Sequence, residues 1–343
     1  MRKINIPVFV PHKGCPNDCI FCNQKKITGV DVMTPEKAEV YIDECVKTLP
    51  RDALCSVAFF GGSFTAIDNT LQESFLKAAE KHINSGKISY IRISTRPDCI
   101  TKEGLSMLYS YGVRAIELGV QSTDDEVLRL ANRGCKTEDV KNAVRLIKEH
   151  GGFELGLQMM TGLPGDTREK TMKTAKDIIS FGADTTRIYP TLVIENSKLG
   201  EMYKSGEYAP LSLEEAVDRC ADLYELFSKN GVSVLRMGLM ASDEISENSA
   251  SVLAGPVHSA FGELVHSRIF LKRILPYAEG QKTLLVYVNP KDTSKALGNK
   301  KCNIKYILDK TGCQVSIYQD STVDTNEIKF SREGNLCTLK ASN

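Results

Sequence analysis

The apolar run Ile4-Asn-Ile-Pro-Val-Phe-Val10 is followed at once by His12-Lys-Gly-Cys15-Pro-Asn-Asp-Cys19-Ile-Phe-Cys22-Asn. The first part predicts a β-strand, and the second places three thiols on the loop that follows it. Iron–sulfur clusters are usually held by four thiolates, so three leave one iron of a cubane open to another ligand. A zinc site made of the three Cys and His12 is the alternative, because zinc takes the same ligands at similar spacings.

Short β-rich apolar runs alternate with periodic helical segments through the first two thirds of the chain. This alternation predicts βα units and a parallel sheet. Six units fit an α/β fold of the partial (β/α)6 TIM-type barrel kind rather than a closed eight-stranded barrel. Helix starts are predicted at Thr34-Pro35 and at the capping box Ser212-x-x-Glu215. The expected strands are Asn5–Val10, Ser56–Phe60, Tyr90–Ser94, Ala115–Val120, Glu154–Met159 and Thr185–Tyr189.

The composition excludes some classes of protein. The net charge of +1 over 343 residues gives no general attraction to nucleic acid or membrane. No apolar run approaches the roughly 20 residues of a membrane-spanning helix, and the first residues lack a signal-peptide pattern. Eight of the eleven Cys are scattered singly, as expected for buried thiols in a reducing compartment. We therefore expect a cytoplasmic protein without membrane contacts.

Polar or glycine-rich turns follow the predicted strands. Gly61-Gly62-Ser63-Phe64 follows the second strand, Arg96-Pro97-Asp98 the third, Gln121-Ser122 the fourth and Gly162-Leu-Pro-Gly165 the fifth. In parallel barrels the functional residues gather at the carboxyl ends of the strands. These turns and the Cys loop therefore predict a single site at that end of the barrel.

The Cys spacing, three residues and then two with an aromatic residue before the last Cys, resembles the signature of radical S-adenosylmethionine (SAM) enzymes. The resemblance implies a [4Fe-4S] cluster on Cys15, Cys19 and Cys22, with SAM chelated to the open iron. It further implies one-electron cleavage of SAM to a 5'-deoxyadenosyl radical, which abstracts hydrogen from a substrate, and a reduced electron donor such as flavodoxin or ferredoxin. The cofactors carry this chemistry, and the protein positions and shields them.

The same resemblance implies roles for residues at the strand ends. In this family the double-glycine turn, here Gly61, Gly62 and Ser63, presents carbonyl groups to the amino group of SAM. In the oxygen-independent coproporphyrinogen oxidase branch, the residue matching Gln121 contacts the ribose, and the residue matching Arg133 pairs with the methionine carboxylate. A bidentate guanidinium suits a carboxylate, although a surface salt bridge is the alternative for Arg133.

Two further positions depart from the family pattern. Gln158 stands where that branch has an acidic residue facing the ribose, and an amide can still form a hydrogen bond with a hydroxyl group. Ser94 stands where relatives often have Glu, and a Ser side chain reaches less far and carries no charge. We include both among the expected SAM contacts.

Over roughly residues 5–245 the chain is similar to the radical domain of the Elongator catalytic subunit family, which makes tRNA wobble-uridine modifications. The most specific matching blocks are Ser94-Thr-Arg-Pro-Asp98, Glu117-Leu-Gly-Val-Gln-Ser-Thr123, Asn132-Arg-Gly134 and Arg187-Ile-Tyr-Pro-Thr-Leu-Val-Ile194. The resemblance stops where the acetyltransferase domain of that family begins. We therefore do not expect its carboxymethyl chemistry to carry over as it stands.

The pattern changes near residue 280. The segment Leu284 to Ile317 predicts strand, helix, helix and strand, and resembles a minimal KH module, whose glycine-rich loop clamps a nucleic-acid backbone. Its loop, Gly298-Asn299-Lys300-Lys301, lacks the usual second glycine, but Lys300 and Lys301 favour phosphate. Seven Lys and two Asp lie between residues 281 and 312, so RNA binding and a solvated basic face are both open. The tail after roughly Asp320 is expected to be loosely structured.

The sequence thus predicts a radical SAM partial-barrel domain at residues 1–250 and a C-terminal extension at residues 251–343, with a KH-like segment at 283–320. We expect a radical SAM enzyme that acts in RNA modification, with tRNA as the substrate. The alternatives are a radical step on a small metabolite or tetrapyrrole, and a non-catalytic, zinc-stabilised RNA-binding adaptor.

Overall fold

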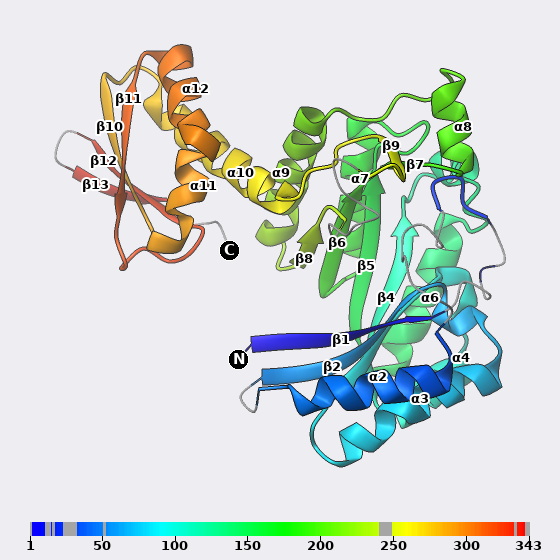
Figure 1. Ribbon diagram of the computed structural model, residues 1–343. Coiled ribbons are helices and arrows are strands. Elements are labelled where there is room, and N and C mark those ends of the chain that lie inside the picture. Colours follow the sequence, from blue (N-terminus) through cyan, green and yellow to red (C-terminus); the bar gives the residue numbers. More distant parts are fainter. Residues whose placement is uncertain are drawn as a thin grey trace.

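In the computed structural model, the described residues are 2–10, 15, 18–22, 33–50, 53–239, 249–332 and 335–339. Figure 1 shows a larger unit built around a sheet and a smaller C-terminal unit, with helix α10 (Phe261–Ala278) leading from one to the other. None of the helices in the described part of the chain is long and apolar enough to cross a membrane.

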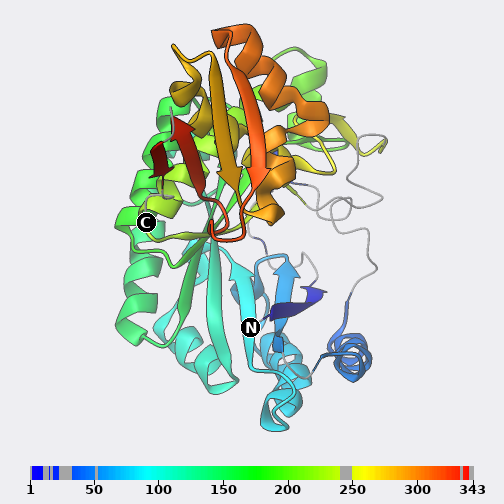
Figure 2. The ribbon, with the colours of Figure 1, turned by 90° about the vertical axis from the view of Figure 1, so that its left-hand side faces the viewer.

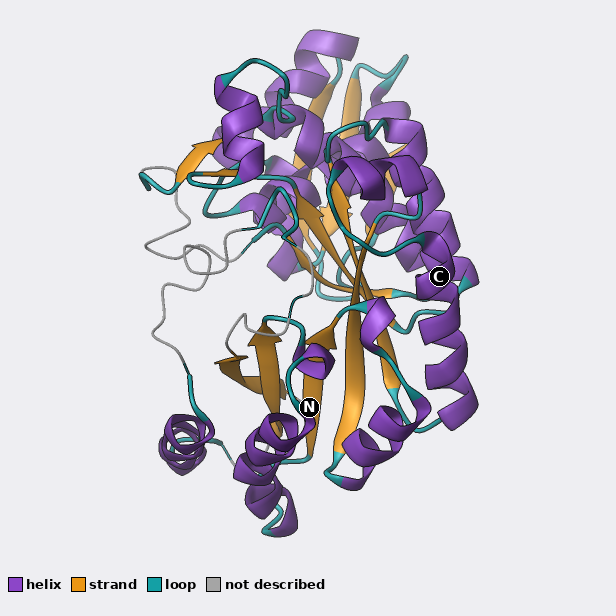
Figure 3. Cartoon of the chain, turned by 90° about the vertical axis from the view of Figure 1, so that its right-hand side faces the viewer, coloured by secondary structure: helices purple, strands orange, loops and turns teal. Residues whose placement is uncertain are grey.

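Seven parallel strands form the sheet of the larger unit, in the order β1-β2-β3-β4-β5-β6-β8. The first six lie side by side in chain order and curl into part of a barrel (Figure 3), which confirms the predicted partial TIM-type barrel. Strand β8 is a seventh strand that the sequence analysis did not anticipate. The bounds are β1 (Arg2–Val10), β2 (Ala53–Gly61), β3 (Tyr90–Thr95), β4 (Val113–Gln121), β5 (Glu154–Thr161), β6 (Thr185–Pro190) and β8 (Ser233–Met237).

Helices connect these strands (Figure 1), and most of them cover one face of the sheet. They are α2 (Pro35–Lys47), α3 (Asn69–Asn84), α4 (Lys102–Ser110), α5 (Asp125–Leu130), α6 (Thr137–His150), α7 (Arg168–Ser180), α8 (Lys198–Lys204) and α9 (Leu213–Lys229). Short 3-10 turns follow β2 (Phe64–Ala66) and β3 (Pro97–Cys99), and β7 (Val193–Ile194) pairs with β9 (Val252–Ala254).

Both predicted helix starts are confirmed. The Thr34 hydroxyl accepts a hydrogen bond from the Lys37 backbone N–H at 3.3 Å. At the start of α9, the Ser212 hydroxyl accepts from the Glu215 backbone N–H, and the Glu215 carboxylate accepts in return from the Ser212 N–H. These bonds satisfy N–H groups that a helix end would otherwise leave unpaired.

Strand alternation decides which side chains reach the functional face. In β4, Ile116, Leu118 and Val120 are fully buried in the apolar core that the sheet shares with the helices. Successive side chains of a strand point to opposite faces, so Glu117, Gly119 and Gln121 belong to the face without that helical cover. Polar residues on that face sit inside the partial barrel.

The C-terminal unit contains the predicted strand, helix, helix and strand. These are β10 (Thr283–Val288), α11 (Thr293–Leu297), α12 (Cys302–Thr311) and β11 (Gln314–Gln319), with 3-10 turns at Pro290–Asp292 and Asn299–Lys301. The expectation of a loose tail is wrong, because β12 (Ile328–Arg332) and β13 (Asn335–Leu339) complete a sheet of order β11-β10-β12-β13. Ile328 and Phe330 are buried and anchor β12 against β10.

Two apolar clusters divide at α10. Val265 and Ile269 belong to the barrel core, whereas Phe270 and Ile274 belong to the core of the C-terminal unit. The helix therefore contributes to both units, and the domain boundary near residue 250 stays a prediction.

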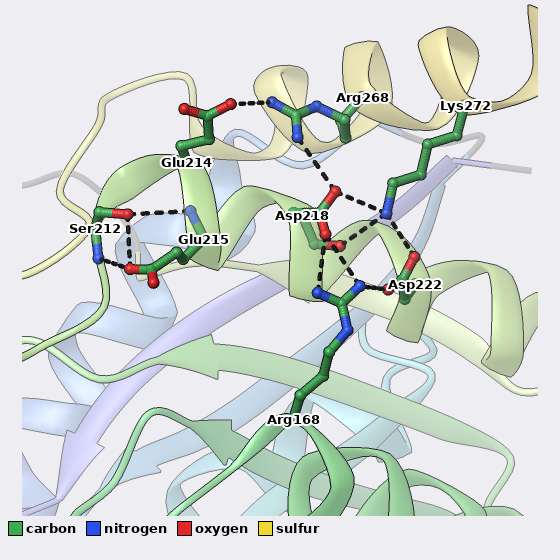
Figure 4. Close-up of polar contacts among 8 residues, drawn as sticks. All are labelled: Arg168, Ser212, Glu214, Glu215, Asp218, Asp222, Arg268 and Lys272. Carbon is green, nitrogen blue, oxygen red and sulfur yellow. Dashed lines mark hydrogen bonds and ion pairs between the residues drawn. The ribbon is translucent and has the colours of Figure 1, made fainter. Parts of the chain in front are cut away.

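Ion pairs hold α10 against the barrel helices (Figure 4). The Asp218 carboxylate on α9 accepts hydrogen bonds from Arg168 on α7 at 3.0 Å and from Arg268 on α10 at 3.2 Å, and it lies 2.8 Å from Lys272 Nζ. Asp222 pairs with Arg168 and Lys272 as well. Burial opposes the charge on Asp218, but Lys272 and Arg168 hold its pKa below the usual value.

We expect Asp218→Asn to lower the free energy of unfolding by about 1–3 kcal/mol, because three cations lose a shared, partly buried carboxylate. A carboxylate with a lowered pKa contributes stability above its unfolded pKa, and this contribution is lost as the pH falls through the folded pKa. The difference from the wild type should therefore shrink in acid. Urea unfolding at neutral and acidic pH measures both effects.

Glu214→Gln is the matched control. The Glu214 side chain is 82% exposed and contacts only Arg268 among the cations of this network, and exposed pairs contribute about 0–1 kcal/mol. Equal destabilisation by the two variants would contradict a special role for Asp218.

Candidate cofactor site at the carboxyl ends of the strands

The Cys segment after β1 is tied to neighbouring elements by backbone hydrogen bonds. The Ile20 N–H donates to the Ala131 carbonyl at 3.1 Å, and the Leu199 N–H donates to the Ile20 carbonyl at 2.8 Å. The Asn132 side-chain amide donates to the Asp18 carbonyl at 2.8 Å. Residues 18–20 are thereby fixed between the loop after α5 and the start of α8.

Cys19 is buried, whereas Cys15 and Cys22 are half-buried. His12, the fourth ligand of the alternative zinc site, lies outside the described residues. Within the described ranges, no three His, Cys, Asp or Glu side chains converge on a point where they could hold a metal ion. The assignment of Cys15, Cys19 and Cys22 as cluster ligands therefore stays a prediction.

Arg133 reaches from the loop after α5 to the Cys segment. It is 6% exposed, and its Nη1 donates to Cys19 Sγ at 3.5 Å while its Nη2 donates to the Gly119 carbonyl at 2.7 Å. Its Nε is buried and has no hydrogen-bond partner among the residues that the structure describes. The guanidinium thus lies between a predicted cluster ligand and the end of β4, and it keeps one buried donor for a ligand.

Arg96 holds Arg133 in place, a role that the sequence analysis missed. Its Nε and Nη2 donate to the two carboxylate oxygens of Asp98 at 2.9 and 2.8 Å, and Nη2 also donates to the Arg133 carbonyl at 2.8 Å. Burial raises the pKa of the Cys15 thiol, and the Ser63 backbone N–H, Arg96 and Arg133 oppose that rise. Two cations therefore lie near the predicted cluster ligands and favour their thiolate forms.

The glycine turn after β2 is placed against the end of β1. Gly61 has φ +102°, and a Cβ there would lie 3.0 Å from the Val10 carbonyl oxygen. Only glycine fits this close approach without strain. The Ser63 hydroxyl accepts from the Arg96 N–H at 3.0 Å and contacts the Thr95 hydroxyl, so its side chain supports β3, whereas its backbone N–H faces Cys15.

Gln121 and Gln158 are brought together at the ends of β4 and β5. The Gln158 amide donates to Gln121 Oε1 at 3.2 Å. Gln121 is 6% exposed and has φ +68°, a left-handed conformation that is unfavourable for residues other than glycine. Such strain is concentrated at functional sites, which agrees with a ligand-binding role for this residue.

Ser94 is engaged by a charged pair that the sequence analysis did not single out. Its hydroxyl donates to Glu117 Oε1 at 3.3 Å, and Arg187 Nη1 donates to the same oxygen at 3.0 Å. Glu117 is 3% exposed, and the Arg187 guanidinium lies over the Phe60 ring. Two signals in the sequence pointed to Glu117: it begins one of the matching blocks, and it has the same strand parity as Gln121. Inside the barrel, Glu117 supplies a carboxylate next to Ser94.

The remaining predicted residues, Lys300 and Lys301, lie apart from this group, beyond α10 in the C-terminal unit (Figure 1). Both have left-handed backbone conformations, with φ of 49° and 60°. Gly298 is needed in front of them, because a Cβ there would lie 2.6 Å from Cys302 Sγ.

This arrangement fits a cluster with SAM. The thiols after β1 offer cluster ligands, Arg133 keeps a buried donor for a carboxylate, and the Gln121–Gln158 pair offers amide groups for hydroxyls. The glycine turn allows a ligand to approach the backbone closely.

Fold and site together define a radical SAM protein. A family model described as the radical SAM superfamily matches residues 9–178, and a model described as the radical SAM C-terminal domain matches residues 183–270. The chain therefore belongs to the radical SAM superfamily, and its cofactors are a [4Fe-4S] cluster and SAM.

Within the superfamily the chain resembles proteins of the Elp3 type. It is 33% identical over 254 residues to a tRNA uridine(34) acetyltransferase of Methanocaldococcus jannaschii, covering 62% of this chain and 47% of that protein. It is 31% identical to human Elongator complex protein 3, with 65% and 46% coverage. The structure of Methanocaldococcus infernus Elp3 aligns with a TM-score of 0.62 at 25% identity, covering 79% of this chain and 63% of that one. The chain spans about half the length of these curated relatives.

Proposed function

We propose that this protein is a radical SAM enzyme that modifies RNA, with tRNA as the substrate, in the cytoplasm. Cys15, Cys19 and Cys22 hold the cluster, while Gly61, Gly62, Ser63, Ser94, Gln121, Arg133 and Gln158 contact SAM. When bound there, the cofactors supply a 5'-deoxyadenosyl radical for hydrogen abstraction. The electron comes from a donor such as reduced flavodoxin or ferredoxin.

One observation carries the cofactor part of this proposal: Arg133 contacts both Cys19 Sγ and the end of β4. A cation in that position can bind an anionic group of a ligand that also lies against the Cys segment. Arg96 and Asp98 orient Arg133 from behind. Gln121 and Gln158 can exchange their mutual hydrogen bond for bonds to ribose hydroxyls without leaving the barrel interior.

The RNA part is supported by two observations. The Methanocaldococcus jannaschii relative described above is a tRNA uridine(34) acetyltransferase. The α11–α12 loop presents Lys300 and Lys301 at the surface of a basic segment. Because the matches cover about half of those relatives, the reaction on the base is not carried over.

Anaerobic reconstitution tests the proposal. The protein with iron, sulfide and a strong reductant should cleave SAM to 5'-deoxyadenosine, and tRNA should change the rate or the products. Mass spectrometry of nucleosides from cells with and without the protein should then show one altered modification. Failure of the iron-loaded protein to cleave SAM would refute radical chemistry.

For tRNA binding, we expect Lys300→Glu with Lys301→Glu to weaken affinity by at least about tenfold and to reduce the dependence of log K on log salt by about two ion equivalents. The reason is the loss of two phosphate contacts. Anisotropy titrations of bulk tRNA at several salt concentrations measure both quantities.

The control is Lys47→Glu, a charge reversal at the end of α2, where Lys47 pairs with the exposed Glu44. If the loop variant and the control bind tRNA equally well, Lys300 and Lys301 have no role in RNA binding.

A further inference from the structure

The sheet of the C-terminal unit has one covered face and one open face. Leu284, Val286 and Val288 of β10 are buried in a cluster with Ile307 of α12. The alternate side chains point the other way. In Figure 2, strands β10 and β11 of this sheet face the viewer.

Two tyrosines and a lysine form a row across this open face. The strand register places Tyr287 of β10 beside Tyr318 of β11 and beside Lys329 of β12. The two rings are stacked, with centroids 5.6 Å apart and planes 28° apart. Lys329 Nζ donates to the Thr322 hydroxyl at 3.0 Å and lies 3.9 Å from the Asp320 carboxylate, so its position in the row is fixed.

The row is open to solvent. Tyr318 is 48% exposed and lies on β11, the edge strand of the sheet, while Tyr287 is half-buried beside it. Neither ring belongs to the apolar cluster beneath the sheet. The stacked pair therefore presents aromatic surface that the fold of this unit does not use for its core.

We propose that the row Tyr318–Tyr287–Lys329 binds unpaired RNA bases, which stack on the exposed tyrosine ring. This inference rests on the proposed RNA substrate and adds a second contact surface to it, on the sheet rather than on the α11–α12 loop. Exposed aromatic rings on a sheet are a recurrent means of binding single-stranded RNA.

The charge of the unit favours RNA over an acidic or apolar protein surface. Between residues 281 and 332 the unit has eight Lys and one Arg against four Asp and one Glu, an excess of four positive charges. Asp292 is fully buried and pairs with Lys295, so it adds little negative potential at the surface. The lysines supply positive potential for phosphates, and the tyrosines supply ring faces for bases.

The test uses the full chain and two labelled probes, a short single-stranded RNA and an RNA duplex of the same length. Tyr318→Leu and Tyr287→Leu should each weaken binding of the single strand by about tenfold, the range expected for loss of one base–aromatic stack. Binding of the duplex should change little, because its bases are not free to stack. Tyr318→Phe keeps the ring and should bind like the wild type.

Tyr41→Leu is the matched control, because Tyr41 is an exposed tyrosine on α2 of the barrel. A second measurement needs no variant: single-stranded RNA containing 4-thiouridine should crosslink to residues 314–319 of the wild type. Crosslinks confined to the barrel would overturn the inference.

The outcomes separate this inference from the proposed function. Wild-type affinity in both leucine variants, with SAM cleavage and tRNA binding intact, would overturn the stacking surface and leave the proposed function standing. A wild-type protein that cleaves SAM but binds neither probe would overturn both the stacking surface and the RNA substrate. Binding of a protein instead, abolished by Tyr318→Leu, would also contradict it.

Discussion

Cys19→Ser is expected to abolish SAM cleavage and to leave the anaerobically reconstituted protein without its full complement of iron. Three thiolates bind three irons of the cluster and leave the fourth iron for SAM. With serine at one of these positions only two thiolate ligands remain, which is fewer than a stable cubane needs. Cys19 is also the thiol that Arg133 contacts, so its loss removes the link between the cluster segment and the end of β4. Iron and sulfide analysis and the yield of 5'-deoxyadenosine measure the effect.

Cys55→Ala provides the control for losing a buried thiol. Cys55 is 2% exposed and lies in β2, within the apolar core. Its replacement should cost some stability but leave the iron content and SAM cleavage unchanged. If Cys19→Ser retained iron and activity, Cys19 would not be a cluster ligand. A wild-type protein that held zinc and no iron would contradict the proposed function altogether.

The barrel could be predicted because its signals are local. Each of the first five strands is an apolar run followed by a polar or glycine-rich turn, and all of the first six strands were predicted to within a few residues at each end. Strand β8, Ser-Val-Leu-Arg-Met, is short and partly exposed at the sheet edge, so its sequence lacks the continuous apolar character of the buried strands.

The end of the C-terminal unit was predicted wrongly for a similar reason. The segment Asp320-Ser-Thr-Val-Asp-Thr-Asn326 is typical of a loop. The strand pattern that follows it, with apolar residues at Ile328 and Phe330 and polar residues between and after them, is too short to predict a strand by itself. Those two side chains are buried only because β10 pairs with β12. A pairing between residues some forty positions apart leaves little trace in the local pattern.

The candidate site shows the same limit. The motifs predicted which turns lie at the site. They did not predict the contacts between side chains that come from different strands and turns. Arg96 holds Arg133 across 37 positions, and Glu117 pairs with Arg187 across 70. Strand parity could have pointed to Glu117, whereas no pattern in the sequence pairs Arg96 with the Arg133 carbonyl.

Arg133→Gln is expected to weaken SAM binding by about 10- to 100-fold while leaving the iron content unchanged. Charge-assisted hydrogen bonds contribute about 1.5–3 kcal/mol, and each 1.4 kcal/mol is a factor of ten in affinity. Arg133→Lys should lose most of this affinity as well. A lysine ammonium group keeps the charge, but it lacks the planar, forked donors with which a guanidinium binds the Gly119 carbonyl and a carboxylate at the same time. Equilibrium binding of SAM to the cluster-loaded protein measures the loss, and the cluster EPR signal should change less on SAM addition.

Arg129→Gln separates this role from a general loss of charge, because Arg129 is an exposed residue of α5 only four positions away. It should bind SAM like the wild type. A structural role for Arg133 predicts a different result: a lower free energy of unfolding, because the bonds to Gly119 and Cys19 are lost, but unchanged SAM affinity in the protein that remains folded. Arg133 Nε is buried without a partner among the described residues. A bound SAM carboxylate can satisfy this donor, and we therefore expect the affinity for SAM to fall.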